Sequence, residues 1–158
     1  MSAGEDQFAA RTSARLAAVQ ALYQMEMSGA SSADVAEDFR AGRLPRDEGG
    51  PVDAEPDPDL FSVLIENAVN RQTTIDRTIA RRLSTGWRLE RIDSVARAIL
   101  RAGVVELERT ETPTPIVIDE YVEIAKAFFE GPEPGFINAT LDACAKDVRP
   151  EERKGDVR

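Results

Sequence analysis

Apolar residues recur at three- and four-residue steps along most of this 158-residue chain, and this periodicity constrains the fold more than any other feature of the sequence. Such spacing places apolar side chains on one face of an α-helix, whereas a half-buried strand needs strict alternation. No segment alternates apolar and polar residues for long enough to predict a strand. The pattern therefore predicts an all-α bundle containing several helix hairpins.

Glycine, proline and serine residues divide this pattern into separate helices. The first is predicted over residues 8–27 and ended by Ser28 and Gly29, and a short second helix carries Val35 and Phe39. The later helices are predicted over residues 59–83, 92–107, 115–129 and 136–148. We expect the polar face of the 92–107 segment to be exposed to solvent; this face carries Ser94, Arg97, Arg101 and, just beyond the segment, Glu108.

An acidic, proline-rich segment at about residues 41–58 is predicted to be a flexible linker. The chain has a net charge of -9, and nine acids against three arginines lie between residues 32 and 60. Alternating acids at 53–59 superficially resemble a calcium loop, but prolines occupy the intervening positions, which favours a solvated linker. We predict one domain over 1–158, with an N-terminal helical subdomain at about 8–83 and a C-terminal one at about 88–149.

The residue types available argue against an enzyme. The chain has no histidine and a single cysteine, Cys144, so the commonest general base and the usual zinc ligand sets are missing. The glycine-rich loops that bind nucleotides and the serine elbow of hydrolases are also absent. We therefore expect no catalytic site, no cofactor and no metal. With no signal-peptide or membrane-span pattern, we expect a cytoplasmic protein.

Three residues of the first helix are candidates for RNA binding. Arg11 and Arg15 lie one helical turn apart and Tyr23 two turns further, so the spacing suggests one stripe. Arginine binds phosphate in a forked geometry, and a tyrosine ring can stack on an unpaired base. Spacing alone also allows the structural alternative, a half-buried core tyrosine beside solvent-facing arginines, and periodicity does not decide between them.

Phe136 and Asn138 are a second candidate pair, at the predicted start of the last helix. Backbone amides in the first turn of a helix are unpaired and can hold a phosphate or a base edge. The structural alternative is that Phe136 closes the bundle and Asn138 caps or turns the chain.

Several blocks of the sequence resemble the NusB family of bacterial transcription antitermination factors. The resemblance covers nearly the whole chain apart from the acidic segment. The matching blocks are RLAAVQALY at 15–23, AILR at 98–101, VEL at 105–107, PIVIDE at 115–120, VEIAK at 122–126 and FIN at 136–138 with LD at 141–142.

This resemblance implies an all-α fold of two small helical subdomains and a role in binding rather than turnover. It implies pairing with NusE, a ribosomal small-subunit protein, and joint binding of boxA RNA in nascent ribosomal transcripts, with other Nus factors and RNA polymerase as indirect partners. It assigns RNA contact to Arg11, Arg15, Tyr23, Phe136 and Asn138.

The resemblance also suggests Glu90, Arg97 and Val104 as the face toward NusE. Two other roles stay open for the chain. One is an interaction module or homodimer without RNA specificity of its own. The other is the helical appendage of a ribosomal RNA cytosine methyltransferase, although no methyl-donor loop follows Arg149.

Overall fold

The structure, a computed structural model, describes residues 3–42, 54–84 and 86–150, which form seven α-helices and one short 3-10 helix. These described residues contain no strand, so the prediction of an all-α fold is confirmed. The elements are α1 (Ala3–Ser28), α2 (Ser32–Arg40), α3 (Pro58–Asn70), α4 (Gln72–Arg82), η1 (Leu89–Arg91), α5 (Ser94–Arg109), α6 (Thr114–Phe128) and α7 (Glu133–Val148).

Local backbone and capping interactions explain where α1 ends and where α2 begins. Helix α1 stops at Gly29, whose φ of 76° lies in the left-handed region that glycine adopts without strain. The Gly29 amide still donates to the Met25 carbonyl at 2.8 Å. Helix α2 then begins after Ser31, whose hydroxyl accepts from the Asp34 amide at 3.1 Å.

The single helix predicted over 59–83 is wrong, because the chain breaks at Arg71 into α3 and α4. Arg71 has a φ of -119° and a ψ of 24°, outside the helical region. Its guanidinium forms an ion pair with Glu108 on α5. The break turns the buried faces of α3 and α4 separately toward α5, which one straight helix could not do.

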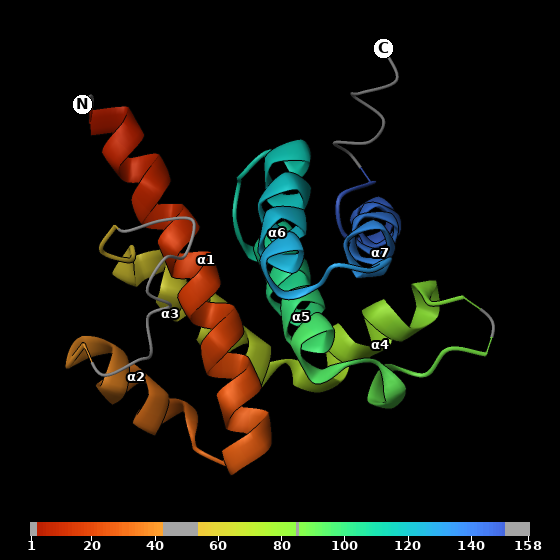
Figure 1. Ribbon diagram of the computed structural model, residues 1–158, viewed down its shortest axis with the longest axis horizontal. Helices are drawn as coiled ribbons and strands as arrows, with labels where there is room; N and C mark the ends of the chain where they lie inside the picture. Colours follow the sequence, from red (N-terminus) through yellow and green to blue (C-terminus); the bar gives the residue numbers. More distant parts are fainter. Residues whose placement is uncertain (1–2, 43–53, 85, 151–158) are drawn as a thin grey trace.

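Helix α5 is the centre of the bundle and packs against α1, α3, α4, α6 and α7 (Figure 1). Gly103 allows α7 to approach closely, since a Cβ at this position would lie 2.8 Å from Cδ2 of Leu141. The expectation of an exposed polar face on this helix is wrong. Arg97 is 9% exposed, and Arg101 and Glu108 are largely covered by ion-pair partners on neighbouring helices.

A buried ionic cluster joins α1 to α5 and α6. The Arg15 guanidinium donates from Nε and Nη2 to the two carboxylate oxygens of Glu106, at 2.8 and 2.7 Å. Its Nη1 donates to Glu120 at 2.7 Å, and the Tyr121 hydroxyl donates to Glu106 at 2.9 Å. Arg15, Glu106 and Tyr121 are at most 1% exposed, so three helices share one desolvated charge network.

The protonation states of this cluster follow from burial and from the partners. Burial opposes the charged form of Arg15, but the hydrogen bond and charge of Glu106 outweigh it and raise the pKa of the guanidinium. Burial, together with the nearby Glu106 carboxylate, raises the pKa of Tyr121 well above its ordinary value. The cluster therefore keeps a charged arginine and a neutral tyrosine at neutral pH.

The acidic segment lies largely outside the described residues. The described residues at its C-terminal end form hydrogen bonds with α1. The Ser13 hydroxyl donates to the Ala54 carbonyl at 2.8 Å, and the Asp57 amide donates to the Ala10 carbonyl at 2.9 Å. The Asp57 carboxylate then caps α3 by accepting from the Asp59 and Leu60 amides. Within the described ranges, no helix is long and apolar enough to span a membrane.

We predict that Arg15→Ala lowers the free energy of unfolding by about 3–5 kcal/mol, because it leaves the Glu106 carboxylate buried without a partner. Urea titration followed by circular dichroism measures this change. The matched control is Lys126→Ala, which removes an exposed pair with Glu123 and should cost less than about 1 kcal/mol. Equal effects of the two substitutions would contradict a buried structural role for Arg15.

We predict that Cys144 is unreactive in the folded protein. Its side chain is fully buried, its thiol faces the Thr78 carbonyl, and burial raises the pKa of the thiol to about 12. Because Cys144 is the single cysteine, labelling with a thiol reagent measures exposure of this one site. Labelling should require unfolding, and rapid stoichiometric labelling of the native protein would show that α7 does not pack as described.

Candidate nucleic-acid interface

Arg15 does not lie on the surface where RNA contact was predicted. All its guanidinium nitrogens donate to Glu106 and Glu120, and its side chain is 1% exposed. The sequence pattern suggested a free phosphate-binding group, since neither carboxylate is near Arg15 in the sequence. We therefore assign Arg15 a structural role, which is to position α1.

Arg11 lies at the edge of an open groove between α1, the start of α3 and the loop before α6. Its Nη2 donates to Oγ1 of Thr112 at 3.0 Å, and its side chain is only partly buried. The groove has a volume of about 580 Å³ and includes the exposed apolar side chains of Phe8 and Ile116. Arg11 is therefore accessible, and the aromatic ring in its groove is that of Phe8 rather than that of Tyr23.

Tyr23 faces a different groove, which contradicts the expectation of one stripe on the first helix. Each four-residue step advances the direction of a side chain by roughly 40°, so three steps separate Arg11 and Tyr23 by roughly 120° around the helix. Tyr23 is 38% exposed and lines an apolar groove of about 570 Å³ with Met27, Val95 and Phe128. This groove lies between the C-terminal ends of α1 and α6 and the start of α5.

Phe136 has a third set of neighbours. Its ring lies 6.0 Å from the ring of Trp87, centroid to centroid, with an angle of 37° between the planes. Helix α7 begins at Glu133, so the expectation that Asn138 sits in its first turn is wrong. Asn138 is exposed on the side of α7, beyond the residues whose amides are unpaired.

The three residues suggested for the partner face also have different environments. Val104 is fully buried in the core and cannot contact a partner from there. Arg97 is almost fully buried and donates to the backbone carbonyls of Leu89 and Ile92, at 3.0 and 2.6 Å. Only Glu90, on η1, is exposed.

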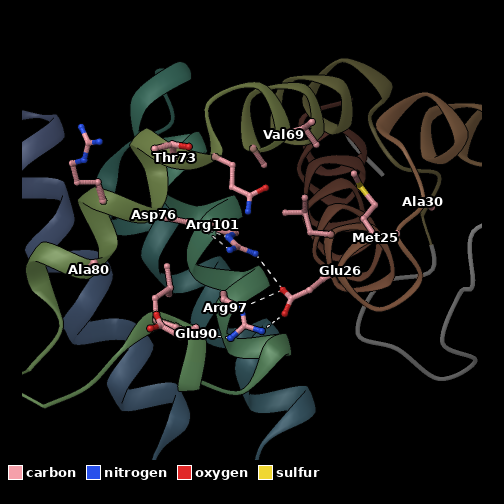
Figure 2. Close-up of a pocket in the computed structure, with 16 residues that line it drawn as sticks. Met25, Glu26, Ala30, Val69, Thr73, Asp76, Ala80, Glu90, Arg97 and Arg101 are labelled. Carbon is pink, nitrogen blue, oxygen red and sulfur yellow. Dashed lines mark hydrogen bonds and ion pairs between the residues drawn. The ribbon is translucent and has the colours of Figure 1, made fainter.

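Glu90 lines a groove of about 810 Å³ between the end of α1, α4 and η1. Figure 2 shows the ion pairs that cross this groove. Glu26, near the end of α1, accepts from Arg97 and Arg101 on α5, and Arg101 also donates to the Asp76 carboxylate on α4 at 2.8 and 2.9 Å. The groove thus combines carboxylates with apolar side chains such as Met25 and Val69.

These ion pairs shift the protonation equilibria of the groove. The hydrogen bonds and charge of Arg97, supported by Arg101, hold the pKa of the Glu26 carboxyl below its ordinary value. Burial opposes the charged form of Arg101, but the Asp76 and Glu26 carboxylates outweigh this and raise the pKa of that guanidinium. Glu26 therefore remains an anion at neutral pH.

The structure separates the arginines between residues 71 and 109 into two groups. Arg71, Arg82, Arg97 and Arg101 form ion pairs with acids on other helices. The remaining five are exposed; they are Arg77, Arg81, Arg88, Arg91 and Arg109. Positive charge available to a polyanion therefore lies on α4, η1 and the end of α5 more than on α1.

Sequence reasoning missed the exposed rings of Trp87 and Phe128, which are 59% and 39% exposed. The signal for Trp87 was its place in a turn after Gly86, where a large apolar side chain has little core to enter. Among the described residues, no group of three or more histidines, cysteines, aspartates or glutamates could hold a metal ion.

We predict that Glu26→Gln lowers the free energy of unfolding at pH 7 by on the order of 1 kcal/mol, a value limited by solvent screening. Because the folded pKa of Glu26 is depressed, its contribution is fully present above the unfolded pKa of about 4.3 and is lost as pH falls through the folded pKa. The difference between variant and parent should thus shrink between about pH 5 and pH 3. Urea titrations across this range measure it, with Glu123→Gln as the exposed control; a difference that is independent of pH would contradict the assignment.

Comparison with known proteins identifies the family. The chain matches the NusB family over residues 12–146. It is 56% identical over 140 residues to the transcription antitermination protein NusB of Caulobacter vibrioides, an alignment that covers 88% of this chain and 94% of that protein. The protein of the same name from Maricaulis maris is 47% identical over 152 residues, covering 96% of this chain and 95% of that protein.

Solved structures agree at the level of the fold. NusB of T. maritima superposes with a TM-score of 0.74 at 28% identity, covering 92% of this chain and 96% of that one. A structure of the antitermination factors NusB and NusE in complex with double-stranded RNA contains a similar chain, with a TM-score of 0.69 at 24% identity, covering 87% of this chain and 96% of that one. At that identity the second likeness shows the fold alone. By its sequence and its all-helical architecture together, this chain belongs to the NusB family.

Proposed function

We propose that this chain is a transcription antitermination factor that pairs with NusE and binds boxA RNA in nascent ribosomal transcripts. The observation that carries the proposal is the 56% identity, across almost the full length of both chains, to a protein named as a transcription antitermination factor. A complex of NusB and NusE with RNA is known for a structural relative. The role is binding in the cytoplasm, without catalysis, and it acts on RNA polymerase through other Nus factors.

The charge of the chain supports a shared RNA surface rather than binding by the chain alone. With a net charge of -9, the chain repels a polyanion at long range, and a basic ribosomal protein would compensate for this repulsion. In the groove beside Glu90, the carboxylates of Glu26 and Asp76 are paired with Arg97 and Arg101, so the exposed Glu90 is the acid that a basic partner can meet there. We place the surface that binds the basic partner at this groove. Of the three residues predicted to contact NusE, Glu90 stays in the proposed interface, whereas Arg97 and Val104 do not, because they are buried.

For RNA contact we retain Arg11, Tyr23, Phe136 and Asn138, all of which are at least partly accessible. Tyr23 and Phe136 supply rings on which unpaired bases stack, and Arg11 supplies a phosphate contact. Arg15 acts through α1, because its burial prevents contact with a transcript. The residues lie in three places, so a flexible single strand suits them better than a rigid duplex.

An alternative function is a homodimer or interaction module without RNA specificity. The observation that favours it is apolar exposure on α1, where Phe8 and Met27 are 54% and 56% exposed. Light scattering during RNA titration separates the two functions. A stable dimer that excludes RNA in the presence of NusE would favour the alternative.

We predict that the chain and NusE together bind a fluorescently labelled boxA oligonucleotide more tightly than either protein alone, with a preference over a scrambled strand. Tyr23→Ala should weaken this binding by about 1–3 kcal/mol, the cost of losing one stacked base. Tyr23→Phe, which keeps the ring, should retain most of the affinity. Fluorescence anisotropy measures each value.

The control for this experiment is Ser62→Ala, an exposed position on α3 that does not itself line either groove on α1. It should leave RNA affinity unchanged. An absence of any boxA preference with NusE present would contradict the proposed function. Unchanged affinity in Tyr23→Ala, with boxA preference intact, would contradict only the placement of the site.

A further inference from the structure

The strongest unexplained surface is the turn between α4 and α5, where a tryptophan lies in solvent. Trp87 is 59% exposed although it is one of the largest apolar side chains in the chain. It is nevertheless fixed in place: its amide donates to the Ser84 carbonyl at 3.0 Å, and its ring contacts the ring of Phe136 on α7. An exposed but positioned indole indicates a binding role, because burial does not explain it.

The residues that follow Trp87 anchor this turn and direct two cations outward. Leu89 and Ile92 are each only 7% exposed and fix the segment on the core. Arg88 and Arg91 flank η1 and are exposed, and the Arg91 amide donates to the Arg88 carbonyl at 3.0 Å. In a 3-10 turn, side chains three residues apart eclipse one another, so both guanidinium groups extend from one side of the turn.

Among the described residues, Arg88 and Arg91 form no ion pair with another helix, although two acids, Glu90 and Asp93, lie in the same segment. Arg97 and Arg101, a few residues further on, are held by Glu26 and Asp76. Glu90, the acid between the two cations in the sequence, lines the groove on the side of α1 and α4. The exposed side chains of this turn thus include the indole of Trp87, which contacts Phe136, and the guanidinium groups of Arg88 and Arg91.

We propose that Trp87, Phe136, Arg88 and Arg91 form a base-stacking platform for unpaired RNA. In this platform one base stacks on the exposed indole, whose ring the tilted ring of Phe136 contacts, and the arginines bind the adjacent phosphates. Stacking tolerates any base, while the charges follow the backbone, which is the combination that single-stranded RNA requires. The inference rests on the proposed RNA-binding function and extends its surface beyond α1 to the α4–α5 turn.

Trp87 provides the test directly, because it is the single tryptophan of the chain. Titrating the chain, alone and with NusE, with a single-stranded boxA oligonucleotide should quench the indole fluorescence as a base stacks on it. The same titration followed by anisotropy of a labelled strand gives the affinity independently of the indole. Trp87→Ala should weaken binding about tenfold, and Trp87→Phe should recover most of it. Because Trp87 is exposed, both variants should keep the fold, which circular dichroism checks.

The contribution of the two arginines is tested separately, through the salt dependence of RNA affinity. The double substitution Arg88→Ala and Arg91→Ala should lower the slope of log affinity against log salt by about 1.4, because each contact with a single-stranded phosphate contributes roughly 0.7. Arg40→Ala removes an exposed arginine at the end of α2, away from the surfaces assigned to RNA, and serves as the matched control. Its salt slope should stay that of the parent protein.

The outcomes separate this inference from the proposed function. RNA binding that persists with full affinity in Trp87→Ala, without indole quenching in the parent, would overturn the platform and leave the antitermination role intact. Absence of RNA binding under all conditions would overturn both. Quenching by NusE without RNA, together with weaker NusE binding by Trp87→Ala, would make the surface a protein interface and would also overturn the proposal.

Discussion

The salt bridge between Arg15 and Glu106 holds the bundle together at the point where α1 meets α5. Two parallel hydrogen bonds at 2.7 and 2.8 Å orient the guanidinium, and Glu120 and Tyr121 of α6 complete its surroundings. A charge taken out of water is costly unless its partners are present and well oriented, so this cluster strongly disfavours any other register of α1. The positions of Arg11, Tyr23 and the grooves on either side of α1 all depend on that register.

Ion pairing also divides the arginines into those that connect helices and those that remain exposed. Those that meet acids across helix interfaces fix α4, α5 and α7 relative to one another, as Arg82 does with Asp147 and Arg101 with Asp76. Those without such partners remain available at the surface. An acidic protein can in this way present local positive charge at its surface. Its negative net charge would still repel RNA at long range, and a basic partner would compensate for this repulsion.

The sequence predicted the helical class and most helix ends, because periodicity and breakers are local signals. Gly29 and Pro115 mark their boundaries by backbone preference alone. The break at Arg71 was missed because the residues around it include no glycine or proline, and the break is stabilised by an ion pair to Glu108, 37 residues away. The division into two helical subdomains stays a prediction, as α5 packs against helices of both.

The candidate site was harder to predict, since exposure depends on partners distant in the sequence. Glu106 lies 91 residues from Arg15, and Glu26 lies 71 residues from Arg97, so no local pattern distinguishes these arginines from free ones. One signal was present: the blocks that resemble the NusB family contain Arg15, Glu106 and Glu120 together. An arginine and acids that recur in separate blocks are as consistent with a buried cluster as with a ligand site.

The central claim is that Arg15 supports the RNA surface by positioning α1, without touching RNA. A double-mutant cycle tests it most directly, with Arg15→Met, Glu106→Gln and their combination compared for stability and for boxA affinity in the presence of NusE. Glu106→Gln removes the unpaired charge that Arg15→Met leaves and keeps an acceptor for Tyr121, so the double variant should regain both stability and affinity relative to Arg15→Met. A double variant that regains stability but binds RNA as weakly as Arg15→Met would show that the guanidinium itself contacts the transcript, and would contradict the account.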